Sequence, residues 1–275
     1  MERPCGPEWS TKDSELSHGY FKDTMRESTP WNAENLWKLP VWLRRKHRQY
    51  FFESSRFYPA NKTEKPLGNL CLIAETASQD FKARAILLSL ARVVRKEYYR
   101  FFYPNPADCF KWALEQGNRF LSRQLKQDNN NWLGKVNFAA LSIRADLSIS
   151  LAKIGQPPVL LLTNNEVFDL SRSLSQEGLP FQYFSNVIEG EIKPQDKLLL
   201  LTQDIFEVFD EEEMLRWLLP ARSTGDIKKI FQQKKPALRQ AVGACLIVCA
   251  KKKPRWPLPF QKVWRLFFYR GIIDK

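Results

Sequence analysis

The sequence predicts an α+β domain in which helices pack on the outside of antiparallel β-sheets. Two long helical patterns, at residues 79–102 and 106–126, follow each other directly after the first clear strand. Short apolar runs separated by turn residues come next, and these are typical of antiparallel strands. Two consecutive helices before a series of strands do not fit the βαβ alternation of a parallel sheet. The order of elements therefore favours helices that cover antiparallel sheets.

The 275 residues are enough for one large domain plus tails or for two small domains, and the 44% that are hydrophobic can form a sizeable core. No run of about 18 apolar residues occurs, so no transmembrane helix is expected. The first residues lack the apolar core of a signal peptide. The five cysteines form no CxxC pair, which indicates reduced thiols in a cytoplasmic protein. With only His18 and His47 in the chain, neither a zinc site nor a histidine-based catalytic triad is expected.

The net charge of +13 is concentrated in two segments. Residues 36–65 carry a net charge of +6 and residues 251–275 a net charge of +7, whereas residues 66–250 carry only +3. Basic flanks around a nearly neutral centre favour contact of the flanks with an acidic partner rather than a basic groove within the domain.

Four segments are expected along the chain. Residues 1–30 are polar and aperiodic, which predicts a disordered or loosely packed segment. Residues 31–66 form a basic and aromatic lead-in with the first strand, and its Trp- and Leu-rich beginning could form a short helix interrupted by Pro40. The domain itself spans 67–250, and a basic aromatic tail spans 251–275.

Within the domain, each element follows from its residue pattern. Apolar residues recur at helical spacing in both long helices, and Asn105-Pro106 supplies a cap and a proline for the start of the second. The strands that follow it are expected to form an antiparallel meander. A third helix is predicted to start at Asp210, with Glu213 in a capping-box-like position. Strands are expected at 67–75, 136–143, 147–154, 158–163, 166–170, 183–189, 197–203 and 243–249, and a fourth helix at 226–234.

Four stretches are similar to motifs of the PPM-type (type 2C) metal-dependent serine/threonine phosphatases. LCLIAETASQ (70–79) resembles the family strand that ends in Val-x-Asp-Gly-x-Gly-Gly, and NFAALSI (137–143) resembles the strand that begins Gly-Thr-Thr. ISLAKIGQPPVLLLTNNEVFDLS (149–171) resembles the hairpin with Gly-Asp-Ser-Arg. IKPQDKLLLLTQDIFEVFDEEEM (192–214) resembles Pro-Gly-Asp-x-Leu-Leu-Leu-x-Ser-Asp-Gly-Leu. The resemblance covers residues 50–250 and implies a four-layer α-β-β-α sandwich of two antiparallel sheets flanked by helices.

The resemblance implies that aspartates hold two Mn²⁺ or Mg²⁺ ions, which activate a water for attack on phosphoserine or phosphothreonine. Of the family's carboxylates only two positions survive, Glu75 in place of an aspartate and Asp204. The extra methylene of Glu75 displaces its carboxylate from the position that two preorganised metals require. The other motif positions have changed: Thr76 and Ile205 stand for glycine, Gln156 for aspartate, and Ala241-Val242 for Asp-Asn.

This pattern is that of a degenerate member, with no catalytic residue, no expected cofactor, and Mn²⁺ or Mg²⁺ only if residual activity survives. For both surviving carboxylates a structural role is favoured over metal binding. Glu75 would then be a strand terminus and Asp204 a cap of the turn after a buried strand, while Asp196 would stabilise the turn before that strand.

The basic flanks combine cations with large aromatic side chains. We expect them to dock on the domain or on a partner protein first, on an anionic membrane second, and on nucleic acid least. Residues 41–56 share this character and could lie beside the tail. The candidate contact residues are Arg44, Arg45, Lys46, Arg48, Lys251, Lys252, Lys253, Arg255 and Trp264.

Three functions remain open from the sequence. The domain could be an inactive phosphatase-like module that binds a protein segment across the old active-site rim. It could be a weakly active phosphatase with a rearranged site at Glu75 and Asp204. It could also be a scaffold tethered to the inner face of a membrane by its basic flanks, which is compatible with the first function.

Overall fold

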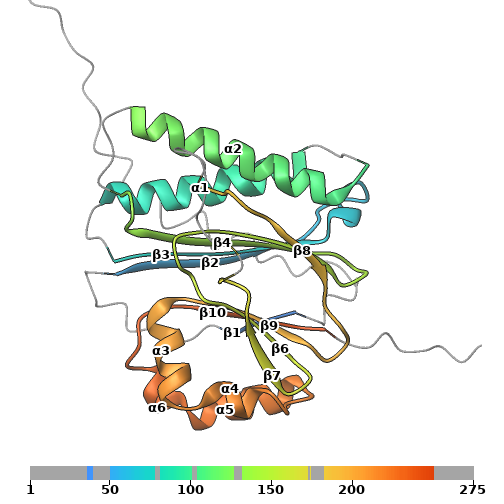
Figure 1. Cartoon of the computed structure of the whole chain (residues 1–275), viewed down its shortest axis with the longest axis vertical. Helices are drawn as coiled ribbons and strands as arrows, with labels where there is room; N and C mark the ends of the chain where they lie inside the picture. The colour runs from blue at the N-terminus through green and yellow to red at the C-terminus, as the bar shows by residue number, and fades with distance from the viewer. Residues whose placement is uncertain are drawn as a thin grey trace, which may run out of the picture. The chain divides into compact units, whose positions relative to one another are not determined.

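The computed structural model describes residues 36–39, 50–77, 81–100, 104–126, 132–172, 174 and 183–250. All of these belong to one compact unit. Two five-stranded antiparallel sheets stack on each other, and helices cover the outer face of each sheet (Figure 1). The predicted four-layer α-β-β-α sandwich is therefore confirmed.

The first sheet carries the two long helices. Its strand order is β2-β3-β4-β5-β8, and α1 and α2 form an antiparallel pair over its outer face (Figure 1). The elements are β2 (Phe51–Phe57), β3 (Asn69–Thr76), β4 (Val136–Ile143), β5 (Ser148–Ile154), β8 (Ile188–Glu191), α1 (Phe81–Arg100) and α2 (Pro106–Lys126), with a short 3-10 turn at Lys65–Leu67 before β3.

The second sheet carries four short helices. Its strand order is β1-β10-β9-β6-β7. The elements are β1 (Leu36–Leu39), β6 (Val159–Thr163), β7 (Glu166–Asp169), β9 (Lys197–Leu201), β10 (Cys245–Cys249), α3 (Gln203–Glu211), α4 (Met214–Leu218), α5 (Thr224–Gln233) and α6 (Lys235–Leu238).

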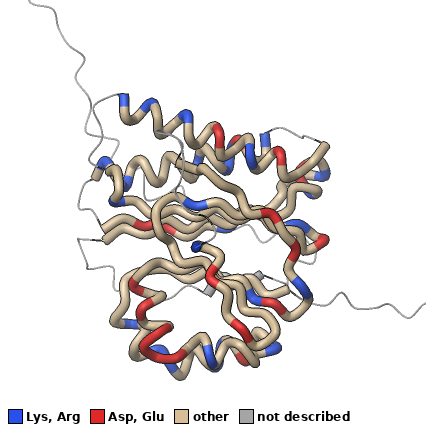
Figure 2. Tube along the Cα trace, viewed as in Figure 1, with Lys and Arg blue, Asp and Glu red and all other residues tan. Residues whose placement is uncertain are grey.

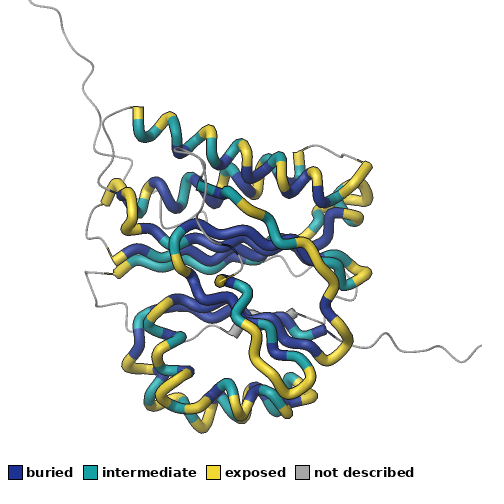
Figure 3. Tube along the Cα trace, viewed as in Figure 1, coloured by how far each residue is buried: buried dark blue, intermediate teal, exposed yellow. Residues whose placement is uncertain are grey.

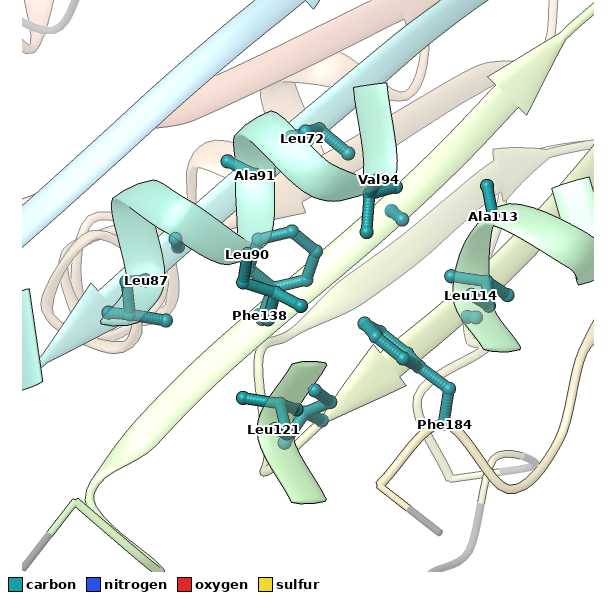
Figure 4. Close-up of a cluster of buried hydrophobic side chains, with 14 of the residues drawn as sticks. Leu72, Leu87, Leu90, Ala91, Val94, Ala113, Leu114, Leu121, Phe138 and Phe184 are labelled. Atoms are coloured by element: carbon teal, nitrogen blue, oxygen red, sulfur yellow. The ribbon is translucent and has the colours of Figure 1, made fainter. Parts of the chain in front are cut away.

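Apolar side chains fill three layers. Beneath α1 and α2, Phe138 of β4 packs with Leu90 and Phe184 (Figure 4). A second cluster lies between the sheets and a third beneath α3–α6, where Phe209 meets Phe231 edge to face. The central strands are consequently buried on both faces (Figure 3). This explains why their sequences read as continuous apolar runs.

The predicted meander is wrong at one point. β4 and β5 pair within the first sheet, whereas β6 and β7 pair within the second. The chain crosses between the sheets at residues 155–158, Gly-Gln-Pro-Pro. Two consecutive prolines have no N–H to donate to a ladder, so the chain leaves the first sheet there rather than turning back within it.

The helix predicted to start at Asp210 is also misplaced. Asp210 lies inside α3, which begins at Gln203. The chain breaks at Glu213, whose φ of 51° is left-handed and whose side chain makes no cap hydrogen bond, and α4 follows. The fourth predicted helix corresponds to α5, where Ser223 and Asp226 form a capping box.

Two further expectations need correction. Residues 36–39, expected within a short helix, form β1 and pair with β10. The strand expected at 183–189 is β8, Ile188–Glu191. Residues 51–56 belong to β2, an edge strand of the first sheet, and the tail expected beside them lies outside the described residues.

The expectations for residues 1–30, the basic residues at 44–48, and the tail with Trp264 lie outside the described residues. Among the helices that are described, none has the length and apolar character needed to span a bilayer.

Candidate functional site at the rim between the sheets

The candidate site lies where β3 of the first sheet ends and α3 of the second layer begins. Glu75 is the second-last residue of β3, and its neighbour in register on β4 is Asn137. Asp204 lies in the first turn of α3. The two carboxylates singled out in the sequence are therefore brought to the same rim by different sheets.

The Glu75 carboxylate caps α3 from the opposite sheet. The backbone N–H of Gln203 donates to both of its oxygens, at 3.2 Å to Oε1 and 3.1 Å to Oε2. The Asn137 amide Nδ2 also donates to Oε1, at 2.8 Å. Since the first backbone N–H groups of a helix have no partner within it, this carboxylate supplies one for α3.

Thr202 precedes α3 and does not cap the helix with its side chain. Its hydroxyl instead accepts the backbone N–H of Ala244 at 2.9 Å, which joins the end of β9 to the start of β10. The cap from Glu75 thus takes the place of a local one.

Asn137 extends this network to the crossover between the sheets. Its Oδ1 accepts the backbone N–H of Gln156 at 2.9 Å, while its Nδ2 holds Glu75. Gly155, with φ of 72°, leaves the space that Oδ1 needs, since a Cβ there would lie 2.2 Å from that oxygen. A chain of hydrogen bonds thereby links the crossover after β5 to β4, β3 and α3 along the rim.

Burial sets the electrostatics of Glu75. Loss of water contact raises the pKa of this carboxyl, and the charges of Asp204 and Glu207 raise it further, against the opposing effect of the hydrogen bonds from Asn137 and Gln203. Asp204 is half-buried and its negative charge lies at the positive end of the α3 dipole.

No family model and no curated protein sequence matches this chain. Solved structures do. A serine/threonine phosphatase of S. agalactiae matches with a TM-score of 0.51 and 14% sequence identity, over 78% of this chain and 98% of that one. The PP2C phosphatase domain with a fragment of the regulatory domain of SpoIIE from Bacillus subtilis matches with a TM-score of 0.50 and 14% identity, over 75% of this chain and 58% of that one.

The chain has the PPM-type phosphatase fold. The other positions at which this chain differs from the family motifs vary in burial and packing. Thr76 is buried, and Ile205 and Ala241 belong to the apolar cluster beneath α3–α6. Val242 is half-buried, and Gln156 is exposed. Within this fold the structure thus gathers Glu75, Asp204 and the Gln156 turn at the rim, and assigns Ile205 and Ala241 to packing.

Asp196 lies at the opposite end of β9 from this rim. Its Oδ2 accepts the backbone N–H of Lys193 at 2.7 Å, so it stabilises the turn before β9 as predicted.

Sequence reasoning missed three residues of the rim: Asn137, Gln203 and Lys153. Lys153 of β5 is only 6% exposed, and its ammonium donates to Gln156 Oε1 at 2.9 Å. Burial lowers the pKa of this ammonium, and the negative charge of Asp169 acts in the opposite direction. The available signal was a single lysine within the apolar strand SISLAKI.

Proposed function

We propose that this PPM-type domain is catalytically inactive and acts as a binding or regulatory module. The observation that carries the proposal is the engagement of Glu75, whose two oxygens accept hydrogen bonds from Gln203 and Asn137. A carboxylate that caps a helix and ties one layer to another serves the stability of the fold. A metal ligated by Glu75 would compete with those hydrogen bonds for the lone pairs of the carboxylate.

The donor set at the rim does not fit a pair of Mn²⁺ or Mg²⁺ ions. Such ions take about six oxygen ligands each, several of them carboxylates. The rim offers Glu75 and Asp204, and in the described part of the chain no group of three or more His, Cys, Asp or Glu side chains is placed to hold a metal ion. The Lys153 ammonium adds a positive charge near the same crossover turn, which further disfavours a cation.

A binding role is supported by the polar groups that remain accessible at the rim. The side chains of Gln156, Gln203 and Glu207 are exposed and come from both layers. They offer amide and carboxylate groups to a protein segment that lies across the two sheets. Regulation by such a partner requires no hydrolysis.

Weak phosphatase activity is the second candidate, and the proximity of Glu75 and Asp204 is the observation that favours it. A membrane-tethered scaffold is the third. It rests on the basic flanks in the sequence, with Arg44, Arg45 and the Lys251–Lys253 run.

The first test is calorimetric titration of Mn²⁺ and Mg²⁺ into the full chain, with hydrolysis of a generic phosphate ester measured in the same samples. We expect no saturable binding at millimolar metal and no turnover above the buffer blank. Micromolar binding of two ions together with turnover would refute the proposal.

The double variant Glu75→Gln/Asp204→Ala makes the test specific to the rim. If the wild type binds metal and the double variant does not, the rim is a metal site and the weak phosphatase becomes the preferred function. If Glu207→Gln binds metal as well as the wild type does, the loss of binding in the double variant is specific to Glu75 and Asp204 and is not caused by removing just any acidic residue of α3.

A further inference from the structure

The strand β7 is an open edge of the second sheet. It pairs with β6 on one side, and no other described strand lies beside it. Its residues are mostly exposed (Figure 3), among them Val167 at 38% and Phe168 at 46%. β8, an edge strand of the first sheet, exposes Glu189, Gly190 and Glu191 instead. Charged side chains discourage further pairing at an edge, whereas an exposed apolar edge can accept another strand.

The strand register shows which backbone groups of β7 are open. The N–H of Leu170 donates to the carbonyl oxygen of Val159 at 2.9 Å, so these two opposite residues form a hydrogen-bonded pair. Such pairs alternate along an antiparallel ladder, so Phe168 also bonds to β6, whereas Val167 and Asp169 do not. The N–H and C=O groups of Val167 and Asp169 therefore point away from β6. In the described part of the chain no backbone group pairs with them.

The tail, residues 251–275, leaves this same sheet within reach of the open edge. Cys249, at the end of β10, is in register with Lys197 of β9. Lys197 is in register with Leu162 of β6, and Leu162 with Val167. A strand added beside β7 would thus lie four strand spacings, about 19 Å, from β10. The ten residues that follow Cys249 span about 30 Å when extended, which is enough to reach that position.

The tail has the composition of a linker followed by a strand. Three prolines within residues 254–259 favour an extended chain and oppose a helix. Residues 263–269, VWRLFFY, then contain five β-branched or aromatic side chains, which are the types that fit a pleated sheet. The apolar part of the tail therefore begins where the linker reaches β7.

Charge favours the tail over a second copy of β7 as the occupant of this edge. Residues 260–270 contain three basic residues and no acidic one, whereas the β6–β7 hairpin, residues 159–169, contains two acidic residues and no basic one (Figure 2). Asp169 pairs with Arg172 at 3.2 Å, and the exposed Glu166 is the acidic group available to a basic strand. Two copies of β7 side by side would instead bring like charges together, which is destabilising.

We propose that residues 260–269 of the same chain add a strand to the open edge of β7. The outward backbone groups of Val167 and Asp169 would then be paired, and apolar side chains of the added strand would cover Val167 and Phe168. In such strand addition the main-chain hydrogen bonds provide affinity and alternate side chains provide specificity. The inference concerns a different surface from the rim and is independent of the function proposed for it.

The test is amide hydrogen exchange of the full chain, followed by nuclear magnetic resonance. The Val167 and Asp169 amides should exchange at least about tenfold more slowly in the wild type than in Arg265→Pro/Leu266→Pro. This double variant removes two consecutive N–H donors, one of which would face β7 in either register of the added strand. The Phe168 amide bonds to β6 and should be equally protected in both proteins, so it serves as the internal reference.

Matched variants separate backbone pairing from side-chain composition. Arg265→Thr/Leu266→Val changes the same two side chains and removes the same charge but keeps both N–H donors, so protection should remain. Val167→Pro removes only a donor that points away from β6, and the Asp169 amide should then exchange as fast as in the proline variant of the tail. Val167→Thr keeps that donor and should behave like the wild type.

The proposal is overturned if the Val167 and Asp169 amides exchange at the same rate in the wild type and in the proline variant of the tail. Equally fast exchange would mean that the edge is open, and equally slow exchange that another segment covers it. The proposal is also overturned if protection rises with protein concentration and sedimentation shows a dimer. The edge would then be covered by a second copy of the chain.

Discussion

The two helical layers cover equivalent faces of two five-stranded sheets but are attached in different ways. α1 and α2 have 20 and 21 residues and share one large apolar cluster with their sheet. The helices of the other layer have 9, 5, 10 and 4 residues. The first of these, α3, is capped by Glu75 of the opposite sheet. The α1–α2 layer is therefore held by contacts with its own sheet. The layer that begins with α3 depends in addition on Glu75, a residue of the other sheet.

Because α3 depends on a residue of the other sheet, the rim joins the two halves of the domain. At the rim a hydrogen-bonded chain from Gln156 through Asn137 and Glu75 to Gln203 joins the two sheets. The apolar cluster between the sheets completes the connection. The domain should consequently unfold as one unit in spite of its two unlike layers.

The largest expected loss of stability comes from removing one buried aromatic ring from the apolar cluster beneath each helical layer. Phe138→Ala and Phe209→Ala remove rings that have no exposed surface, one beneath each helical layer. Each variant should lose about 3–5 kcal/mol of unfolding free energy, as buried Phe→Ala changes do. Urea unfolding followed by tryptophan fluorescence and by far-ultraviolet circular dichroism should show one shared transition in both variants. Two separated transitions would mean that the layers unfold independently.

A smaller effect is expected from the crossover turn. Gly134→Ala and Gly155→Ala both place a Cβ at positive φ, which costs roughly 1 kcal/mol. At Gly134 nothing lies within 4 Å of the new atom, whereas at Gly155 it would meet Asn137 Oδ1 at 2.2 Å and the Val136 carbonyl oxygen at 2.6 Å. Gly155→Ala should therefore cost about 1–3 kcal/mol more than Gly134→Ala. If both variants lose the same unfolding free energy in urea, the hydrogen bonds of Asn137 do not help to join the layers.

The same contrast explains which parts of the fold could be predicted. The start of α2 was recognisable because its signals are local: Pro106 is the first helical residue, and Asn105 Oδ1 accepts the backbone N–H of Ala107 at 3.1 Å. The start of α3 was not recognisable, because its capping group lies 128 residues away in the sequence. At 155–158 the sequence predicts a turn between paired strands rather than a crossover, since glycine and proline mark both.

For the site, the resemblance identified Glu75 and Asp204, and the structure brings them together. Their surroundings could not be predicted, because Asn137 and Lys153 carry no signal until the strand register is known. For Glu75, the sequence identifies the carboxylate, whereas its hydrogen bonds to another layer depend on tertiary structure alone.

The smallest effect concerns the protonation of Glu75. Burial raises the pKa of this carboxyl above the ordinary 4.5, so the folded protein holds the proton more tightly than the unfolded chain. Its contribution to stability is therefore fully present below that ordinary value and is lost as the pH rises through the raised one. Glu75→Gln does not titrate and should lack this loss.

Urea unfolding of the wild type and of Glu75→Gln over a pH series measures this contribution as the difference between the two proteins. The difference cancels the opposite slopes of other carboxyls such as Asp146, whose pKa is lowered by its hydrogen bonds to Ser148 against the effect of burial. Wild type should lose stability relative to Glu75→Gln as the pH rises above the ordinary value. A difference that grows in favour of the wild type would mean that its hydrogen bonds to Gln203 and Asn137 outweigh the cost of burying the charge. In that case the ionised carboxylate would be the stronger link between the layers.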